Sequence, residues 1–195
     1  MSKHIAIIQG HPDPQGNHYG NALSAAYTKS ASESGHEIRA IDVARLDFPL
    51  LRSKEDFDHG TPPDSIRQAQ ETIRWADHLV IFYPLWLGSM PALLKAFLEQ
   101  VFRPGFATPK PDDSSPLKKL LAGKSARIVV TMGMPAFFYR WFFRAHSLKN
   151  LERNILGFCG IGPIKESLIG MVEADDGSKR EKWLSKMRVL GSKAL

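Results

Sequence analysis

LVIFYPLWLGSMP, at residues 79–91, begins as an unbroken apolar run and then passes between two prolines. Successive apolar and aromatic residues of this kind are typical of a strand buried on both faces of a parallel sheet. The segment between Pro84 and Pro91 is also mostly apolar and contains Trp86, although loops are usually polar. The sequence therefore predicts an apolar loop at the end of a buried strand, where it would form one wall of a ligand crevice. A second interpretation, that Trp86 only packs against the next helix, stays open.

Other apolar runs repeat this pattern on either side. Strands are expected at 4–10, 36–43, 78–83, 126–133 and 162–170, and helices at 19–34, 64–75, 91–102, 141–156 and 178–190. We expect Asp64 to be an N-cap, Pro91 to be a first helical residue, and Gly35 to end the first helix. Residues 46–64 and 102–116 are rich in turn residues and are expected to be irregular.

The alternation of strands and helices indicates an α/β fold. One domain over residues 1–195 would hold a doubly wound, five-stranded parallel sheet of order 2-1-3-4-5, with helices on both faces. Ligands bind such sheets at the carboxyl ends of the first and third strands. The loops at 10–18 and 84–90 leave those two ends, and the loop at 133–139 leaves the fourth strand beside them. We therefore expect these three loops to form the site.

Composition limits the class of protein. The chain has 195 residues, 43% of them hydrophobic and 24% charged, as expected for one soluble globular domain. A single cysteine, Cys159, excludes a disulfide within the chain and favours the cytoplasm, and no apolar span is long enough for stable membrane insertion. The net charge of +6 is scattered and no DNA or RNA module is recognisable, so nucleic acid is not an expected partner. The histidines lack the spacing of metal ligands, so we expect no metal.

The loop GHPDPQGNHYGN, residues 10–21, joins the first strand to a helix. Gly16 lets the backbone approach a ligand closely, and free N–H groups at a helix N-terminus attract an anion such as a phosphate. The spacing is neither GxGxxG nor that of a Walker loop, which disfavours a nucleoside triphosphate. An ordinary loop capped by Asn or His is an equally good interpretation of this stretch alone.

The segment TMGMPAFFYRWFFRAH, residues 131–146, places six aromatic residues in the seven positions from 137 to 143. One helix face cannot bury that many, so some of them are expected to line a pocket or a subunit interface. Stacking on single-stranded nucleic acid is a weaker interpretation, because the cluster is short and directly follows a buried strand.

Together these loops resemble the NAD(P)H:quinone oxidoreductases of the DT-diaphorase type, which have a flavodoxin-like fold. The most specific likeness is PLWLGSMPALLKAFLEQVF at 84–102, followed by PGFA at 104–107. The early GHP loop and GFCG at 157–160 are further matches. The modulator-of-drug-activity proteins and the ancillary reductases of potassium-efflux systems belong to the same resemblance, which covers nearly the whole chain.

The resemblance implies a flavin cofactor, with FAD slightly favoured over FMN, and NAD(P)H as the hydride donor. It implies a ping-pong, two-electron hydride transfer to a small quinone-like acceptor, in a homodimer whose active sites lie at the subunit interface. Two alternatives stay open: a flavin-binding ancillary subunit of a membrane transporter, and a flavodoxin-type electron carrier. Carriers of that type are typically acidic, whereas this chain is basic.

The resemblance also implies roles for individual residues. The flavin phosphate would lie against His11, Gln15, Gly16, Asn17, His18 and Tyr19, where His18-Tyr19-Gly20 replaces the usual Ser-Phe-Asn. The ring edge would lie along Pro84, Leu85, Trp86, Leu87 and Gly88, with the backbone N–H of Trp86 or Leu87 near flavin N5. The pyrimidine side of the ring would contact Thr131, Gly133, Met134 and Tyr139. Tyr139 and His146 are the expected catalytic residues, because relatives use a tyrosine and a histidine to accommodate charge on the reduced ring.

Overall fold

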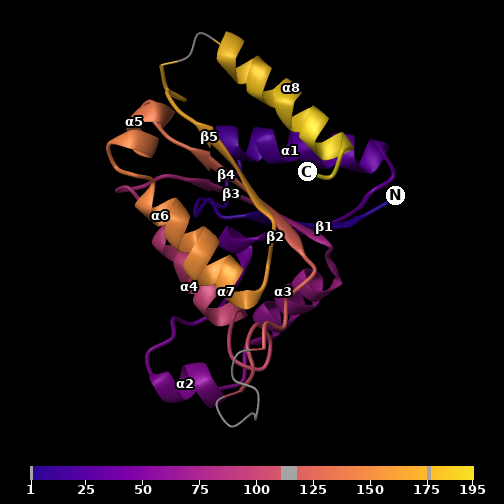
Figure 1. The fold of residues 1–195 in the computed structure, drawn as a ribbon, viewed down its shortest axis with the longest axis vertical. Coiled ribbons are helices and arrows are strands. Elements are labelled where there is room, and N and C mark those ends of the chain that lie inside the picture. The colour runs from indigo at the N-terminus through magenta and orange to yellow at the C-terminus, as the bar shows by residue number, and fades with distance from the viewer. Residues whose placement is uncertain (1, 111–117, 175–176) are drawn as a thin grey trace.

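Five parallel strands form the centre of the molecule, which is described here by a computed structural model covering residues 2–110, 118–174 and 177–195. The strands are β1 (His4–Gln9), β2 (Glu37–Asp42), β3 (His78–Pro84), β4 (Ser125–Thr131) and β5 (Ile164–Ile169). They lie in the order β2-β1-β3-β4-β5, and every neighbouring pair is parallel (Figure 1). The predicted sheet order is therefore confirmed.

Helices cover both faces of this sheet (Figure 1). On one face lie α1 (Tyr19–Glu33) and α8 (Ser178–Ser192). On the other face lie α3 (Asp64–Trp75) and α4 (Ala92–Val101). A continuous helical stretch on that second face consists of α6 (His146–Lys149), a π segment (Asn150–Leu156) and α7 (Gly157–Cys159). Short helices occur at η1 (Val43–Arg45), α2 (Lys54–His59) and α5 (Ala136–Trp141). In β1, Ile5 and Ile7 enter the core under α1 and α8, while Ala6 and Ile8 enter the opposite core. Burial on both faces explains why such strands are continuous apolar runs.

The register of the strands brings three chain segments to one edge of the sheet. Gln9 at the end of β1 lies opposite Phe82 of β3, and Pro84 at the end of β3 lies opposite Thr131 of β4. The ladder continues one residue further, because the Leu85 N–H donates to the Thr131 carbonyl at 2.8 Å. The loops that follow β1, β3 and β4 therefore begin side by side, as the sheet order predicts.

Helix starts depart from the sequence prediction in two places. Pro63, not Asp64, occupies the N-cap of α3, and Asp64 is its first residue. Pro91 is the N-cap of α4 instead of its first helical residue, because its ψ of 145° is still extended. The predicted stop at Gly35 is confirmed, since Gly35 follows the C-cap of α1 with a left-handed φ of 83°.

The helix expected at 141–156 is also corrected. The chain instead forms α5, turns at Arg144 and Ala145 with φ angles of 53° and 48°, and starts a second helix at His146. The stretch expected to be irregular at 46–64 contains α2, whose N-cap Ser53 accepts the Asp56 N–H at 3.0 Å. The irregular stretch predicted at 102–116 lies outside the described residues from 111 onward.

Candidate active site

The loops after β1 and β3 touch through aromatic rings. His11 is buried and stacks on His18, with ring centroids 3.7 Å apart and an angle of 15° between the planes. The ring of Trp86 meets His11 edge-on, with centroids 5.8 Å apart. The polar first loop and the apolar second loop thus form adjoining parts of one surface at the carboxyl edge of the sheet.

Asp13 holds the first loop in shape, and the sequence did not single it out. Its carboxylate accepts the Gln15 backbone N–H at 2.9 Å and bonds the His18 ring nitrogen Nε2 at 2.7 Å. Its own backbone N–H donates to Nδ1 of His11 at 3.1 Å. The Gln15 hydrogen bond, and then that of His18, lower the pKa of Asp13, while burial and then repulsion by His18 lower the pKa of His11. A charged Asp13 beside a neutral His11 therefore fixes the loop at neutral pH.

The start of α1 is open for an anion. Its N-cap, His18, makes no side-chain capping hydrogen bond, and Gly16, two residues earlier, has a left-handed φ of 73°. Within the described residues, Oδ1 of Asn21 and Oε1 of Gln9 are buried without a hydrogen-bond partner. Buried amide groups normally have partners, so these two indicate room for a polar ligand at this edge. Neither amide was predicted; the position of Asn21 in the first helical turn was the available signal.

The apolar second loop is a tight turn. The N–H of Trp86 donates to the Ser89 carbonyl and the N–H of Ser89 donates back, both at 2.9 Å. Leu87 and Gly88 between them have φ angles of 47° and 77°, the pattern of a type I′ turn. Leu87 at the tip is fully exposed, and Trp86 leaves 49% of its surface exposed instead of being buried against α4. Because the Trp86 N–H is used within the turn, the N–H of Leu87 is the better candidate donor to a ring edge.

The third loop is held from behind by the chain that follows β5. The N–H of Met171 donates to the Met134 carbonyl at 3.2 Å, and that of Val172 donates to the Met132 carbonyl at 3.3 Å. Gly133 is exposed, and a Cβ on it would lie 3.9 Å from the carboxylate of Glu173. Thr131, at the end of β4, is buried. Sequence reasoning could not place Glu173 here, because its proximity to Gly133 arises only from the pairing of β4 and β5.

Tyr139 and His146 are not placed alike. Tyr139 is 1% exposed; its hydroxyl accepts the Leu148 N–H at 3.2 Å and shares a hydrogen bond with Ser147 at 2.9 Å. The hydroxyl is therefore enclosed in the core, where it joins α5 to α6. His146 is exposed at the first position of α6. Within the described residues no hydrogen bond joins the two side chains, although the Tyr139 hydroxyl bonds to Ser147 and Leu148 directly after His146.

Cys159 is buried, and burial raises the pKa of its thiol to about 11, which fits a structural thiol. Within the described ranges, no helix is long and apolar enough to cross a membrane, and no three His, Cys, Asp or Glu side chains are grouped to hold a metal.

Comparison with known proteins places this geometry in context. A family model described as "Flavodoxin-like fold" matches residues 3–190. An "Uncharacterized NAD(P)H oxidoreductase" of Haemophilus influenzae is 28% identical over 179 residues, which cover 90% of this chain and 87% of that protein. The "Ribosyldihydronicotinamide dehydrogenase [quinone]" of Pongo abelii is 26% identical over 185 residues, covering 81% and 77%. The structure of an NAD(P)H:quinone oxidoreductase from Methanothermobacter marburgensis matches with a TM-score of 0.81 and 23% identity, over 100% of this chain and 98% of that one.

Proposed function

This chain belongs to the family with the flavodoxin-like fold, and from that premise we propose that it is a flavin-dependent NAD(P)H oxidoreductase that reduces quinone-type acceptors. The observation that carries the proposal is the ring contact between His11 and Trp86. It joins a loop suited to a phosphate to a turn suited to a flat apolar ring. The names of the relatives from Haemophilus influenzae and Pongo abelii support the same activity.

The residues present fit a flavin. The uncapped start of α1 and the left-handed Gly16 offer backbone N–H groups to a phosphate, and the unpartnered amides of Gln9 and Asn21 offer further polar contacts. Leu87 and Trp86 offer exposed apolar surface to the ring. Such a flavin, when bound, supplies two-electron hydride chemistry. FAD and FMN share these contacts, and the likeness to the DT-diaphorase type favours FAD.

The side chains of this protein would orient the cofactor and exclude water. Asp13 keeps the rings of His11 and His18 stacked, which fixes the first loop against Trp86. The Trp86–Leu87 turn would cover one edge of the ring, with the Leu87 N–H free to donate there. The net charge of +6 would attract the phosphates of NAD(P)H.

We assign Tyr139 a positioning role in place of the catalytic one. Its hydroxyl holds α5 against α6 directly after the loop that carries Gly133 and Met134. His146 is exposed, and its role in accommodating charge on the reduced ring stays a prediction. A homodimer with active sites at the interface also stays a prediction.

The test is a visible absorption spectrum of the purified protein, followed by anaerobic addition of NADH or NADPH. A bound flavin that bleaches, and that recovers its colour when a quinone is added, supports the proposal. Release of the flavin by heat then distinguishes FAD from FMN. A flavin that stays oxidised with both nucleotides points to an electron carrier or an ancillary subunit of a transporter, and a protein that neither retains nor takes up flavin refutes the assignment of all three loops.

A further inference from the structure

The amino edge of the sheet, opposite the candidate active site, holds a second cavity. It has a volume of about 360 Å³ and lies where β1, β3, β4 and β5 begin. Side chains from all four strand starts line it, among them Lys3, His78, Ser125 and Lys165. Because β3 has seven residues, the two edges of the sheet are about 20 Å apart. The cavity is therefore separate from the loops after β1, β3 and β4.

His78 contributes an unused hydrogen-bonding group to this cavity. It is the first residue of β3, lines the cavity and is 3% exposed. Its Nδ1 shares a hydrogen bond with the Ser125 hydroxyl at 2.8 Å. Its Nε2 is buried and has no hydrogen-bond partner among the described residues. Buried ring nitrogens normally have partners, so the fold leaves this one for a group from outside.

Three cations act on the His78 ring. Burial, and then repulsion by these cations, lower the pKa of the ring to about 4. They are, in decreasing order of effect, Lys3, Arg127 and Lys165. Among the described residues, no carboxylate side chain forms an ion pair with any of the three. Arg127 is buried and donates to the main-chain oxygen of Leu195 at 2.8 Å, so Lys3 and Lys165 are the cations that line the cavity.

The remaining polar groups leave Lys165 without a partner. One acidic side chain, Asp77, lines the cavity, but its carboxylate accepts the His4 N–H at 2.9 Å and lies 3.6 Å from the His4 ring nitrogen Nδ1. Lys3 donates to the Ala194 carbonyl at 3.1 Å, which is a neutral acceptor. In the part of the chain that the structure describes, no hydrogen bond or ion pair holds the exposed Lys165 ammonium. The cavity is therefore suited to an anion.

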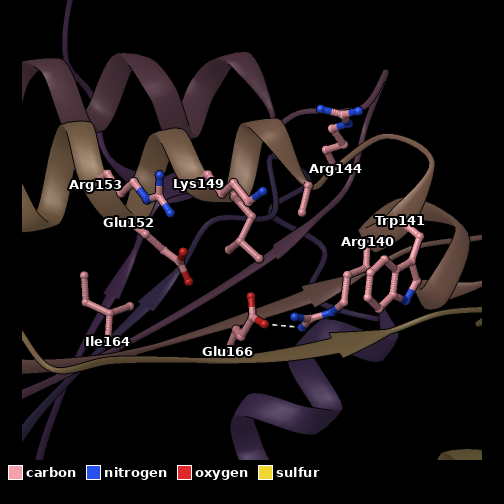
Figure 2. Close-up of a pocket in the computed structure, with 10 residues that line it drawn as sticks. Arg140, Trp141, Arg144, Lys149, Glu152, Arg153, Ile164 and Glu166 are labelled. Carbon is pink, nitrogen blue, oxygen red and sulfur yellow. Dashed lines mark hydrogen bonds and ion pairs between the residues drawn. The ribbon is translucent and has the colours of Figure 1, made fainter.

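The larger cavity beside α5, of about 740 Å³, differs in both respects (Figure 2). Its cations face two carboxylates, Glu152 and Glu166, and Arg140 forms an ion pair with the second. It also adjoins the aromatic residues at 137–143, of which Trp141 lines it and is 77% exposed. We expect those aromatic residues to lie at a subunit interface. The amino-edge cavity shares no lining residue with that surface.

We propose that the amino-edge cavity binds a small oxyanion, a phosphate or a carboxylate group, between Lys3, Lys165 and His78. The two ammonium groups would supply charge-assisted hydrogen bonds. The Ser125 hydroxyl can donate to Nδ1 of His78, which leaves the ring proton on Nε2 for an oxygen of the ligand. The volume lies at the lower end of the range for small-molecule sites. The inference does not depend on the proposed flavin chemistry.

The experiment is NMR spectroscopy of the full chain with labelled histidine, titrated with sulfate against chloride at constant ionic strength. Sulfate represents the oxyanion because its charge does not change near neutral pH. The ring signals separate the two edges of the sheet, since an anion at the start of α1 would move those of His11 and His18. We expect the signals of His78 to move and to saturate with a dissociation constant of about 1 mM. Lys165→Gln should weaken this binding by about fivefold.

A pH titration supplies a second readout. A bound anion raises the pKa of His78, so sulfate should bind about tenfold more tightly at about pH 5 than at pH 7. The titratable and charged groups around the cavity are Lys3, His4, His36, Asp77, Lys124, Arg127 and Lys165. Because the pKa is followed through the signals of His78 itself, titration of the other two histidines does not obscure it.

A matched control separates this site from general basicity. Lys182→Gln removes an exposed cation on α8, outside the cavity lining, and should leave the sulfate affinity unchanged. Urea unfolding of each variant checks that the fold is intact. The proposal is overturned if about 50 mM sulfate leaves the signals and the pKa of His78 unchanged. It is also overturned if Lys182→Gln weakens binding as much as Lys165→Gln. Succinate in place of sulfate distinguishes the sources: tighter binding of succinate supports a carboxylate ligand, and weaker binding supports a phosphate.

Discussion

Gly170 is the position where one methyl group should disturb the third loop of the site most directly. A Cβ at this residue would lie 2.6 Å from the Met134 carbonyl oxygen and 3.0 Å from the Pro135 carbonyl carbon, and closer still to the Ala136 nitrogen. All three obstacles are backbone atoms, so no side-chain rotation relieves the clash. For Gly170→Ala, the loop must move by close to 1 Å to reach ordinary contact distance.

Overpacking of this kind costs about 1–3 kcal/mol, and the backbone obstacles place Gly170→Ala at the upper end. For a chain of this length, about 3 kcal/mol corresponds to a fall in Tm of roughly 6–12 °C. The assay is urea unfolding at constant pH, in which the midpoint should fall without a change in slope. Flavin affinity, measured by fluorescence titration, should fall as well, because the loop carrying Gly133 and Met134 moves.

The matched control is Gly20→Ala in the first turn of α1, where the structure shows no heavy atom of the described chain within 4 Å of the added Cβ. It should be neutral or stabilising by up to about 1 kcal/mol, because alanine favours the helix. If Gly170→Ala unfolds within about 0.5 kcal/mol of the unmodified protein, the close approach of the β5 end to the third loop is refuted as a constraint.

Three further outcomes are expected. Tyr139→Phe should lower the free energy of unfolding in urea by about 1–2 kcal/mol, because the buried Leu148 N–H loses its acceptor. The rate of flavin reduction should stay the same. A rate about a hundredfold slower at unchanged stability would instead restore the catalytic role of Tyr139. Leu87→Asn should raise the free energy of unfolding by about 0.5–1 kcal/mol, because Asn tolerates the left-handed conformation. The same variant should bind flavin more weakly in the fluorescence titration. Tighter binding would contradict the proposal that the Trp86–Leu87 turn forms an apolar wall for the ring. Burial, and then repulsion by Lys3 and Arg127, lower the pKa of His78 to about 4. The neutral ring therefore contributes its full stability to the folded state above pH 6.5, and this contribution is lost as the pH falls through 4. Urea unfolding between pH 7 and pH 4 should therefore show a loss of about 3 kcal/mol that is absent in His78→Asn, and an equal loss in that variant would assign the effect to other groups.

The sequence predicts the sheet because burial on both faces leaves a simple pattern. Strands β1, β3 and β4 are continuous apolar runs, and the order of strands then fixes which loops meet. Helix α2 was missed because its six residues contribute no buried side chain, so no apolar periodicity marks it. The break at Arg144 and Ala145 was missed because neither residue type signals a left-handed conformation.

The candidate site is predictable where it depends on chain order, and unpredictable where it depends on side-chain direction. The loops bearing His11 and Trp86 were expected together and lie together. Tyr139 was expected to face the ligand, but its hydroxyl is enclosed near Ser147. A run of neighbouring aromatic residues does not reveal which member turns inward. Glu173 lies beside Gly133 through pairing between strands that are far apart in sequence.

The turn from Trp86 to Ser89 closes on its own two hydrogen bonds, and the side chain at its tip, Leu87, is fully exposed. The side chain of Leu87 therefore adds nothing to the core, and residue 87 bears on stability only through its left-handed backbone. Replacing this residue is therefore expected to change the surface that the turn offers to a ligand while the strand beneath it keeps its packing.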